Sequence, residues 1–138
     1  MNKWKWYGHA AHFICGRWCR FHLATKVGKY LVSTIGEFVP QEGSMKVLAK
    51  CRNVDLYSLK GDNLEREFIK RFGFEEIGCG RKYETMVFHA GQECKESGCM
   101  CGLPSVASSE LDFLGYNTAG DAASGHMKLC LKWSKKNE

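Results

Sequence analysis

Apolar and β-branched residues alternate with polar ones along residues 21–34, on both sides of the pair Gly28-Lys29. A period of two places successive side chains on opposite faces of a strand. A glycine between two such runs is typical of a β-hairpin turn. The pattern therefore predicts a β-hairpin within a β-rich part of the chain, residues 1–39.

The pattern changes to a helical period over residues 62–72. One apolar stripe is formed there by Leu64, Phe68, Ile69 and Phe72. Asp62 is a candidate N-cap in front of this stripe, and Gly73 is a typical helix stop behind it. We predict a helix at about residues 62–72 whose stripe packs in the core.

The connecting region, residues 40–61, contains a weaker helical signal. Ser44 is a candidate cap for a short helix with Val47, Leu48 and Cys51 on one side. Alternation returns from Tyr83 to His89 and predicts a strand.

The last part of the chain predicts a loop or short strand that leads into a final helix. Asn117 or Thr118 is the candidate cap of this helix. Its expected apolar positions are Ala119, Ala122, Ala123, Met127, Cys130, Leu131 and Trp133. Together these elements predict one small α+β domain with a β-rich half at 1–39, a connector at 40–61, a helix and strand at 62–90 and a cysteine- and histidine-bearing segment at 94–138.

The sharpest chemical signal lies in that last segment. Cys94, Cys99 and Cys101 fall within eight residues, and His126 and Cys130 are four apart in the predicted helix. Residues four apart on a helix share a face. Thiolates and imidazoles in a set of four are typical tetrahedral zinc ligands. We therefore expect one zinc ion held by four of these five side chains, with helix and metal stabilising each other.

A second candidate metal site lies near the N-terminus. Its five donors are His9, His12, Cys15, Cys19 and His22. The last four of them would share a face on a helix, whereas a strand-turn-strand would turn at Cys15-Gly16. The spacing matches no standard zinc pattern, and ordinary packing of the cysteines and hydrogen bonding of the histidines is the competing interpretation.

The charge pattern permits nucleic-acid binding without requiring it. A net charge of +5 is spread over both ends of the chain, as on an ordinary solvated surface. Aromatic residues next to basic ones suit single strands, and the candidate contacts are Trp4, Trp6, Arg17, Trp18 and Arg20. Core packing is the interpretation that we favour for the tryptophans.

Compartment and activity are indicated mainly by missing signals. No apolar run approaches a membrane span, and the first residues lack the apolar core of a signal peptide, so we expect a cytoplasmic protein with reduced cysteines. The sequence also lacks a Walker loop, the His-Glu-x-x-His and Gly-x-Ser-x-Gly motifs, a dinucleotide fingerprint and the deaminase signature. This favours a binding protein over an enzyme.

Three stretches of the chain resemble small hypothetical proteins of tailed bacteriophages and prophages. They are W-K-W-Y-G-H-A-A-H-F-I-C-G-R-W-C-R-F-H-L-A-T-K-V-G at the start, R-K-Y-E-T-M-V-F in the middle and E-L-D-F-L-G-Y-N-T-A-G-D-A near the end. The resemblance implies an accessory viral role in the cytoplasm of an infected bacterium.

Three functions are compatible with these observations. The first is a zinc-stabilised module that binds a host or viral macromolecule, with a protein as the expected partner, for example to modulate host defence. The second is a nucleic-acid-binding accessory protein. The third is a small zinc enzyme that acts on nucleotides or nucleic acid through an open His/Cys site.

Overall fold

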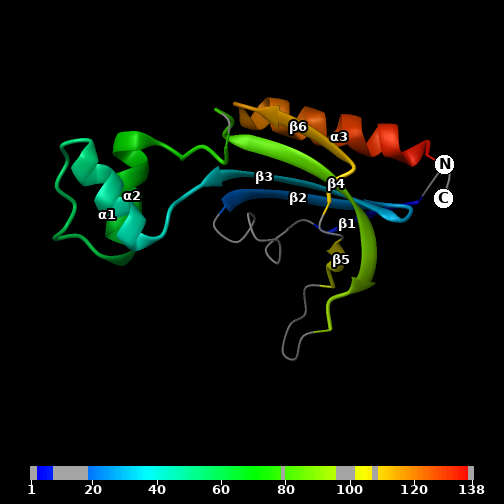
Figure 1. Cartoon of the computed structure of the whole chain (residues 1–138), viewed down its shortest axis with the longest axis horizontal. Helices are drawn as coiled ribbons and strands as arrows, with labels where there is room; N and C mark the ends of the chain where they lie inside the picture. Colours follow the sequence, from blue (N-terminus) through cyan, green and yellow to red (C-terminus); the bar gives the residue numbers. More distant parts are fainter. Residues whose placement is uncertain (1–2, 8–18, 79, 96–101, 107–108, 137–138) are drawn as a thin grey trace.

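The computed structural model describes residues 3–7, 19–78, 80–95, 102–106 and 109–136. An antiparallel sheet forms the centre, a long helix covers one face, and a pair of shorter helices extends from one end (Figure 1). The chain is therefore a small α+β domain, as the sequence predicts. No helix in the described part is long and apolar enough to cross a bilayer.

All strand pairings of the sheet are antiparallel. The strands are β1 (Trp4–Trp6), β2 (Cys19–Val27), β3 (Tyr30–Phe38), β4 (Tyr83–Glu93), β5 (Pro104–Val106) and β6 (Asp112–Tyr116). They pair in the order β1-β2-β3-β4-β5, and β6 also pairs with β4. The predicted hairpin is confirmed, because β2 pairs with β3 from Val27↔Tyr30 onward and Gly28 takes a positive φ of 62° in the turn.

Helix α3 (Ala119–Ser134) lies on one face of this sheet, against β2, β3, β4 and β6. The predicted cap is confirmed, because the Asp121 N–H donates to the Thr118 hydroxyl. The predicted apolar face is wrong in part. Its buried residues are Ala122, Gly125, His126, Leu129, Cys130 and Ser134.

Met127 and Leu131 are 49% and 47% exposed, and Ala119 and Ala123 are exposed too. Met127 directly follows His126, and a helix turns about 100° per residue. Because His126 faces the sheet, Met127 is turned to the helix flank. The same period keeps Leu131 away from the core.

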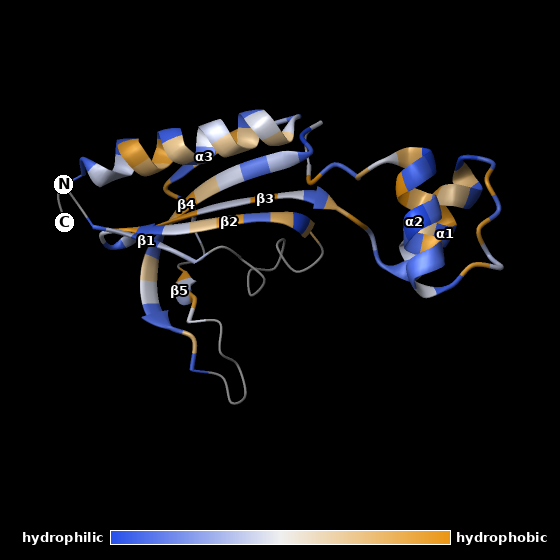
Figure 2. Ribbon diagram, turned by 180° about the vertical axis from the view of Figure 1, so that it is seen from behind, coloured by the Kyte–Doolittle hydropathy of each residue, from blue (hydrophilic) through white to orange (hydrophobic). Residues whose placement is uncertain are grey.

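The helix pair is formed by α1 (Glu42–Cys51) and α2 (Gly61–Phe72), with a core of its own (Figure 2). That core contains Val39, Met45, Ala49, Leu56, Leu64 and Phe68. The α2 prediction is confirmed, with Gly73 as its C-cap, but the N-cap is Lys60 instead of Asp62.

The predicted short helix is confirmed as α1, and Leu48 packs against the core, but the predicted cap and two of the three apolar positions are wrong. Gln41 is its N-cap in place of Ser44. Val47 and Cys51 are exposed, and the buried side is formed by Met45 and Ala49. Apolar residues one turn apart did not reveal which side of this short helix meets α2.

The other face of the sheet carries a smaller apolar cluster. Cys19, Ala24, Ile35 and Leu103 are buried in it. Leu103 directly precedes β5, which lies on the opposite side of the sheet from α3 (Figure 1). Cys94, whose N–H bonds to Leu103, is thus separated by the sheet from His126 and Cys130 on α3.

Candidate functional site

The predicted ligands on α3 form part of a buried polar cluster. His126 is 1% exposed, and each of its ring nitrogens has a threonine partner. Nε2 lies 2.9 Å from the Thr25 hydroxyl of β2, and Nδ1 lies 2.7 Å from the Thr34 hydroxyl of β3. Thr34 is in turn 2.6 Å from the Thr85 hydroxyl of β4. The imidazole therefore connects the helix to three neighbouring strands.

Burial fixes the protonation states in this cluster. It lowers the pKa of His126 from 6.5 to about 4, so the ring is neutral at physiological pH. It raises the pKa of the Cys130 thiol to about 11, although a hydrogen bond with Thr25 opposes this shift. A neutral histidine with both nitrogens engaged and a protonated thiol fit a polar core that holds α3 in one position.

The structure does not bring His126 and Cys130 to Cys94, which is the described cysteine of the predicted set outside α3. Cys94 follows β4 and donates its backbone N–H to the carbonyl of Leu103, 2.6 Å away, and Leu103 packs on the face of the sheet opposite α3. Cys99 and Cys101 lie outside the described residues. Within the described ranges, no three His, Cys, Asp or Glu side chains form a group that could hold a metal ion. Zinc binding by the cysteine segment stays a prediction.

The N-terminal cluster is described only at its end. His9, His12 and Cys15 lie outside the described residues, as do Arg17 and Trp18. Cys19 and His22 both belong to β2, where the His22 ring contacts the Cys19 carbonyl. The helical arrangement is therefore wrong for these two residues. A second metal site in a strand-turn-strand stays a prediction.

The tryptophans of β1 are exposed, and core packing is the wrong interpretation for them. Trp4 is 39% exposed and Trp6 is 59% exposed. They pair with Val27 and Thr25, and Thr25 contacts His126 under α3. Directly opposite residues point to the same face. Both indoles therefore lie on the α3 side of the sheet, and the Trp6 ring is perpendicular to His126 at 6.2 Å.

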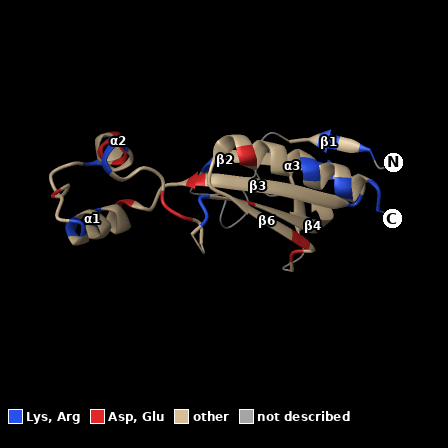
Figure 3. Cartoon of the chain, turned by 90° about the horizontal axis from the view of Figure 1, so that it is seen from above, with Lys and Arg blue, Asp and Glu red and all other residues tan. Residues whose placement is uncertain are grey.

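Helix α3 completes an exposed apolar surface next to these indoles. Figure 3 shows β1 beside the C-terminal half of α3. Gly125 faces Tyr116, and Lys132 bonds to Asp112, so these two positions mark the β6 side of the helix. By helical period, Met127 lies on the opposite flank, towards β1, and Leu131 lies on the outer side of the helix. Both line a shallow hollow together with Lys128, Lys132 and Lys135. We call Trp4, Trp6, Met127 and Leu131 the Trp/Met surface.

Three lysines border the Trp/Met surface. Lys128 and Lys135 border Met127 and Leu131 on α3, and Lys3 directly precedes β1. None of these three lysines forms an ion pair within the described residues. Arg20, in contrast, is paired with Glu65 of α2, away from the indoles. Of the predicted nucleic-acid contacts in the described residues, Arg20 is thus separated from Trp4 and Trp6.

A groove of about 1100 Å³ separates the helix pair from the end of the sheet. Phe38, Phe72 and Phe74 line it together with Arg52 and Arg71. Both arginines are neutralised, by Glu75 at 2.8 Å and by Glu67 at 3.4 Å. This groove therefore offers a less distinct binding chemistry than the Trp/Met surface.

Sequence reasoning missed Met127 and Leu131 as surface residues. The signal was present, because a helix face centred on His126 and Cys130 excludes both of them by period. Comparison with protein-family models, curated proteins and solved structures gives no match for this chain.

Proposed function

We propose that this protein is an accessory binding protein that recognises a partner protein through the Trp/Met surface. The observation that carries the proposal is the exposure of both indoles of β1 beside the apolar flank of α3. The resemblance to phage proteins points to a host or viral protein as the partner. An enzymatic role has no comparable support from the described side chains.

The composition of the surface fits a protein interface. Tryptophan and methionine are enriched at the centres of such interfaces, and buried tryptophans often contribute most of the binding energy. The lysines around the surface supply a polar rim that complements acidic residues. The partner is therefore expected to present an apolar patch bordered by Asp or Glu.

Single-stranded nucleic acid is the second candidate ligand. Exposed indoles can stack on bases, and Lys3, Lys128 and Lys135 can contact phosphates. Lys5 is paired with Glu93 at 3.1 Å, however, and Arg20 is paired with Glu65. The positive charge beside the indoles is therefore limited, which favours the protein partner.

We also propose that Cys94, Cys99 and Cys101 hold zinc with a fourth ligand other than His126. The close spacing of the three thiols supports this site. The engagement of both His126 nitrogens by threonines makes a ligand elsewhere in the chain the better choice. Zinc would then stabilise the segment between β4 and β5.

A capture experiment with matched variants tests the proposed function. Wild type, a Trp4→Ala/Trp6→Ala double variant and a Tyr57→Ala control are immobilised and exposed to bacterial lysate, with and without nuclease. Tyr57 is 51% exposed on the connection between α1 and α2, so the control removes an aromatic ring elsewhere. The captured protein is then purified and titrated against all three.

We expect the double variant to lose at least tenfold in affinity for that purified partner and the control to bind like wild type. Equal binding by all three proteins would refute the proposal. The second candidate would be established instead if capture depended on nucleic acid and single strands quenched the tryptophan fluorescence. Each Trp→Ala change should then cost roughly 1–3 kcal/mol of binding free energy for single strands.

A further inference from the structure

The outer edge of β1 carries unpaired backbone groups. The Tyr7 N–H donates to the Ala24 carbonyl at 2.8 Å, and the Gly28 N–H donates to the Lys3 carbonyl at 2.9 Å. Odd-numbered residues of this strand therefore face β2. In an antiparallel ladder the alternate residues face the other way. The N–H and C=O groups of Trp4 and Trp6 accordingly point outward, and no hydrogen bond to them is found within the described residues.

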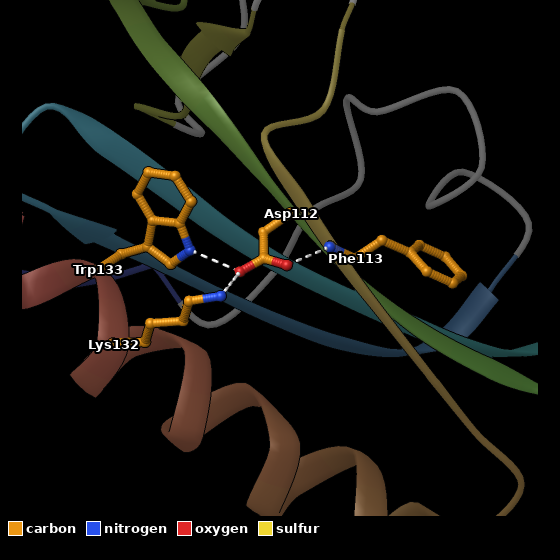
Figure 4. A network of polar contacts seen from close by, with 4 residues as sticks. All are labelled: Asp112, Phe113, Lys132 and Trp133. Carbon is orange, nitrogen blue, oxygen red and sulfur yellow. Dashed lines mark hydrogen bonds and ion pairs between the residues drawn. The ribbon is translucent and has the colours of Figure 1, made fainter.

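The edge at β6 is blocked by the protein itself. The Tyr116 carbonyl accepts from Lys82 of the β4 side, so the alternate residues Phe113 and Gly115 face outward. The Phe113 N–H already donates to the Asp112 carboxylate at 2.9 Å (Figure 4). The Gly115 carbonyl accepts from the Arg81 guanidinium at 3.3 Å.

Asp112 is held in this blocking position by α3. Its carboxylate accepts from Lys132 at 2.7 Å and from the Trp133 indole at 2.9 Å (Figure 4). Natural sheets protect their edges in such ways against unwanted strand pairing. Within the described residues such protection is found at β6 and not at β1, so β1 is an edge that is open to a partner.

We propose that the partner protein docks by adding an antiparallel strand to the outer edge of β1. Strand addition uses main-chain hydrogen bonds for affinity and alternate side chains for specificity. Trp4 and Trp6 supply the main-chain hydrogen bonds, because their backbone groups face outward. They also supply the side chains for specificity, because their indoles lie on the α3 side. This inference rests on the proposed function and specifies how the same surface is used.

In the register that pairs Trp4 with Trp6, a second copy of this chain does not fit the edge. Hydrogen bonding of Trp4 to Trp6 of a second β1 would place the two Lys5 residues directly opposite each other. Like charges in that position destabilise strand pairing. Lys5 also lies opposite Lys26 of β2, and Glu93 is the one acidic side chain paired with Lys5 in the described ranges. An acidic residue on the added strand relieves this excess of positive charge.

The expected strand therefore alternates apolar and acidic residues. Residues opposite Trp4 and Trp6 share their face and pack against the indoles and α3, so they are apolar. The residues between them lie on the face of Lys5 and Lys26, so they are Asp or Glu. In the antiparallel arrangement the apolar residues direct their N–H groups towards β1.

Synthetic peptides test this geometry on the wild-type protein. The probe is a fluorescently labelled alternating valine–glutamate heptapeptide, and binding is followed by anisotropy. We expect at least tenfold weaker binding when lysine replaces glutamate and when the valine amides are N-methylated. N-methylation of the glutamate amides, which point away from β1, should change little.

Two variants of one residue test the same contact from the protein side. Trp6→Ala removes the indole, and Trp6→Pro removes both the indole and the outward N–H. Proline is tolerated at this position of an edge strand because the lost N–H does not bond to β2. We expect Trp6→Pro to bind the glutamate peptide at least threefold more weakly than Trp6→Ala.

Equal effects of the two N-methylated peptides, or no binding of the glutamate peptide at millimolar concentration, would overturn strand addition. Either result leaves the proposed function to its own test, because captured partner binding that depends on both indoles does not require an added strand. Loss of that dependence would overturn the proposed function separately.

Discussion

Acidification should weaken the attachment of α3 to the sheet through His126. The ring is fully buried against threonine hydroxyls, and burial is the cause that lowers its pKa to about 4. The unfolded chain, with a histidine pKa of about 6.5, binds a proton more readily than the folded protein. Between these two values the free energy of unfolding therefore falls as pH falls.

The size of this loss in unfolding free energy follows from the shift in the pKa of His126. Each pKa unit corresponds to about 1.4 kcal/mol, so the full change is about 3 kcal/mol, complete near pH 4. About 2 kcal/mol of it should be lost between pH 7 and pH 5. Above pH 7 the contribution is constant because histidine is neutral in both states.

Urea unfolding at pH 7, 6 and 5 measures this loss. His126→Gln is the test variant, because glutamine can still donate and accept a hydrogen bond but does not titrate. His89→Gln is the control, since His89 is exposed on β4. Between pH 7 and pH 5, His89→Gln should lose as much unfolding free energy as wild type. His126→Gln should lose much less. The reasoning fails if His126→Gln retains the full pH dependence of wild type.

Three further predictions concern other parts of the chain. Burial raises the pKa of Glu84, so Glu84→Gln should raise the urea midpoint of unfolding at pH 7. This gain should shrink as pH falls through the raised pKa of Glu84, and a lower midpoint of the variant at pH 7 would contradict the prediction. Gly36→Ala should cost roughly 1–3 kcal/mol of unfolding free energy, because the new Cβ would lie 2.0 Å from the Tyr83 ring. Gly43→Ala, with no neighbour within 4 Å, is its control in thermal melts and should not destabilise. Elemental analysis should find about one zinc per chain, lost in Cys101→Ser; a metal-free wild type of full stability would refute the zinc site.

Local patterns were sufficient to predict most elements of the fold. The alternation around Gly28 and the stripe ending at Phe72 each describe contacts between residues that are close in sequence. Gly73 and Thr118 mark helix ends by backbone chemistry that is equally local. These features need no knowledge of the rest of the chain.

The candidate site could not be predicted in the same way, because it depends on contacts between distant residues. Whether His126 binds a metal or a hydroxyl depends on Thr25 and Thr34, far away in sequence. The exposure of Trp4 depends on β1 taking the edge of the sheet, which a three-residue strand does not reveal. The residue type of tryptophan favoured a core position for the two indoles. The edge position of β1 in the sheet left them exposed instead.

The helix pair is inserted between β3 and β4, which are neighbours in the sheet from Gly36↔Tyr83 onward. Closing a connection roughly ten times longer than a tight turn costs about 2 kcal/mol of chain entropy. The separate apolar core of α1 and α2 must offset this cost within the insertion itself. We therefore expect the backbone amides of α1 and α2 to exchange with deuterium as one cooperative unit, while those of β3 and β4 stay protected. The same arrangement would let a short loop replace the insertion without loss of the sheet, so the helix pair can be gained, lost or exchanged as a module.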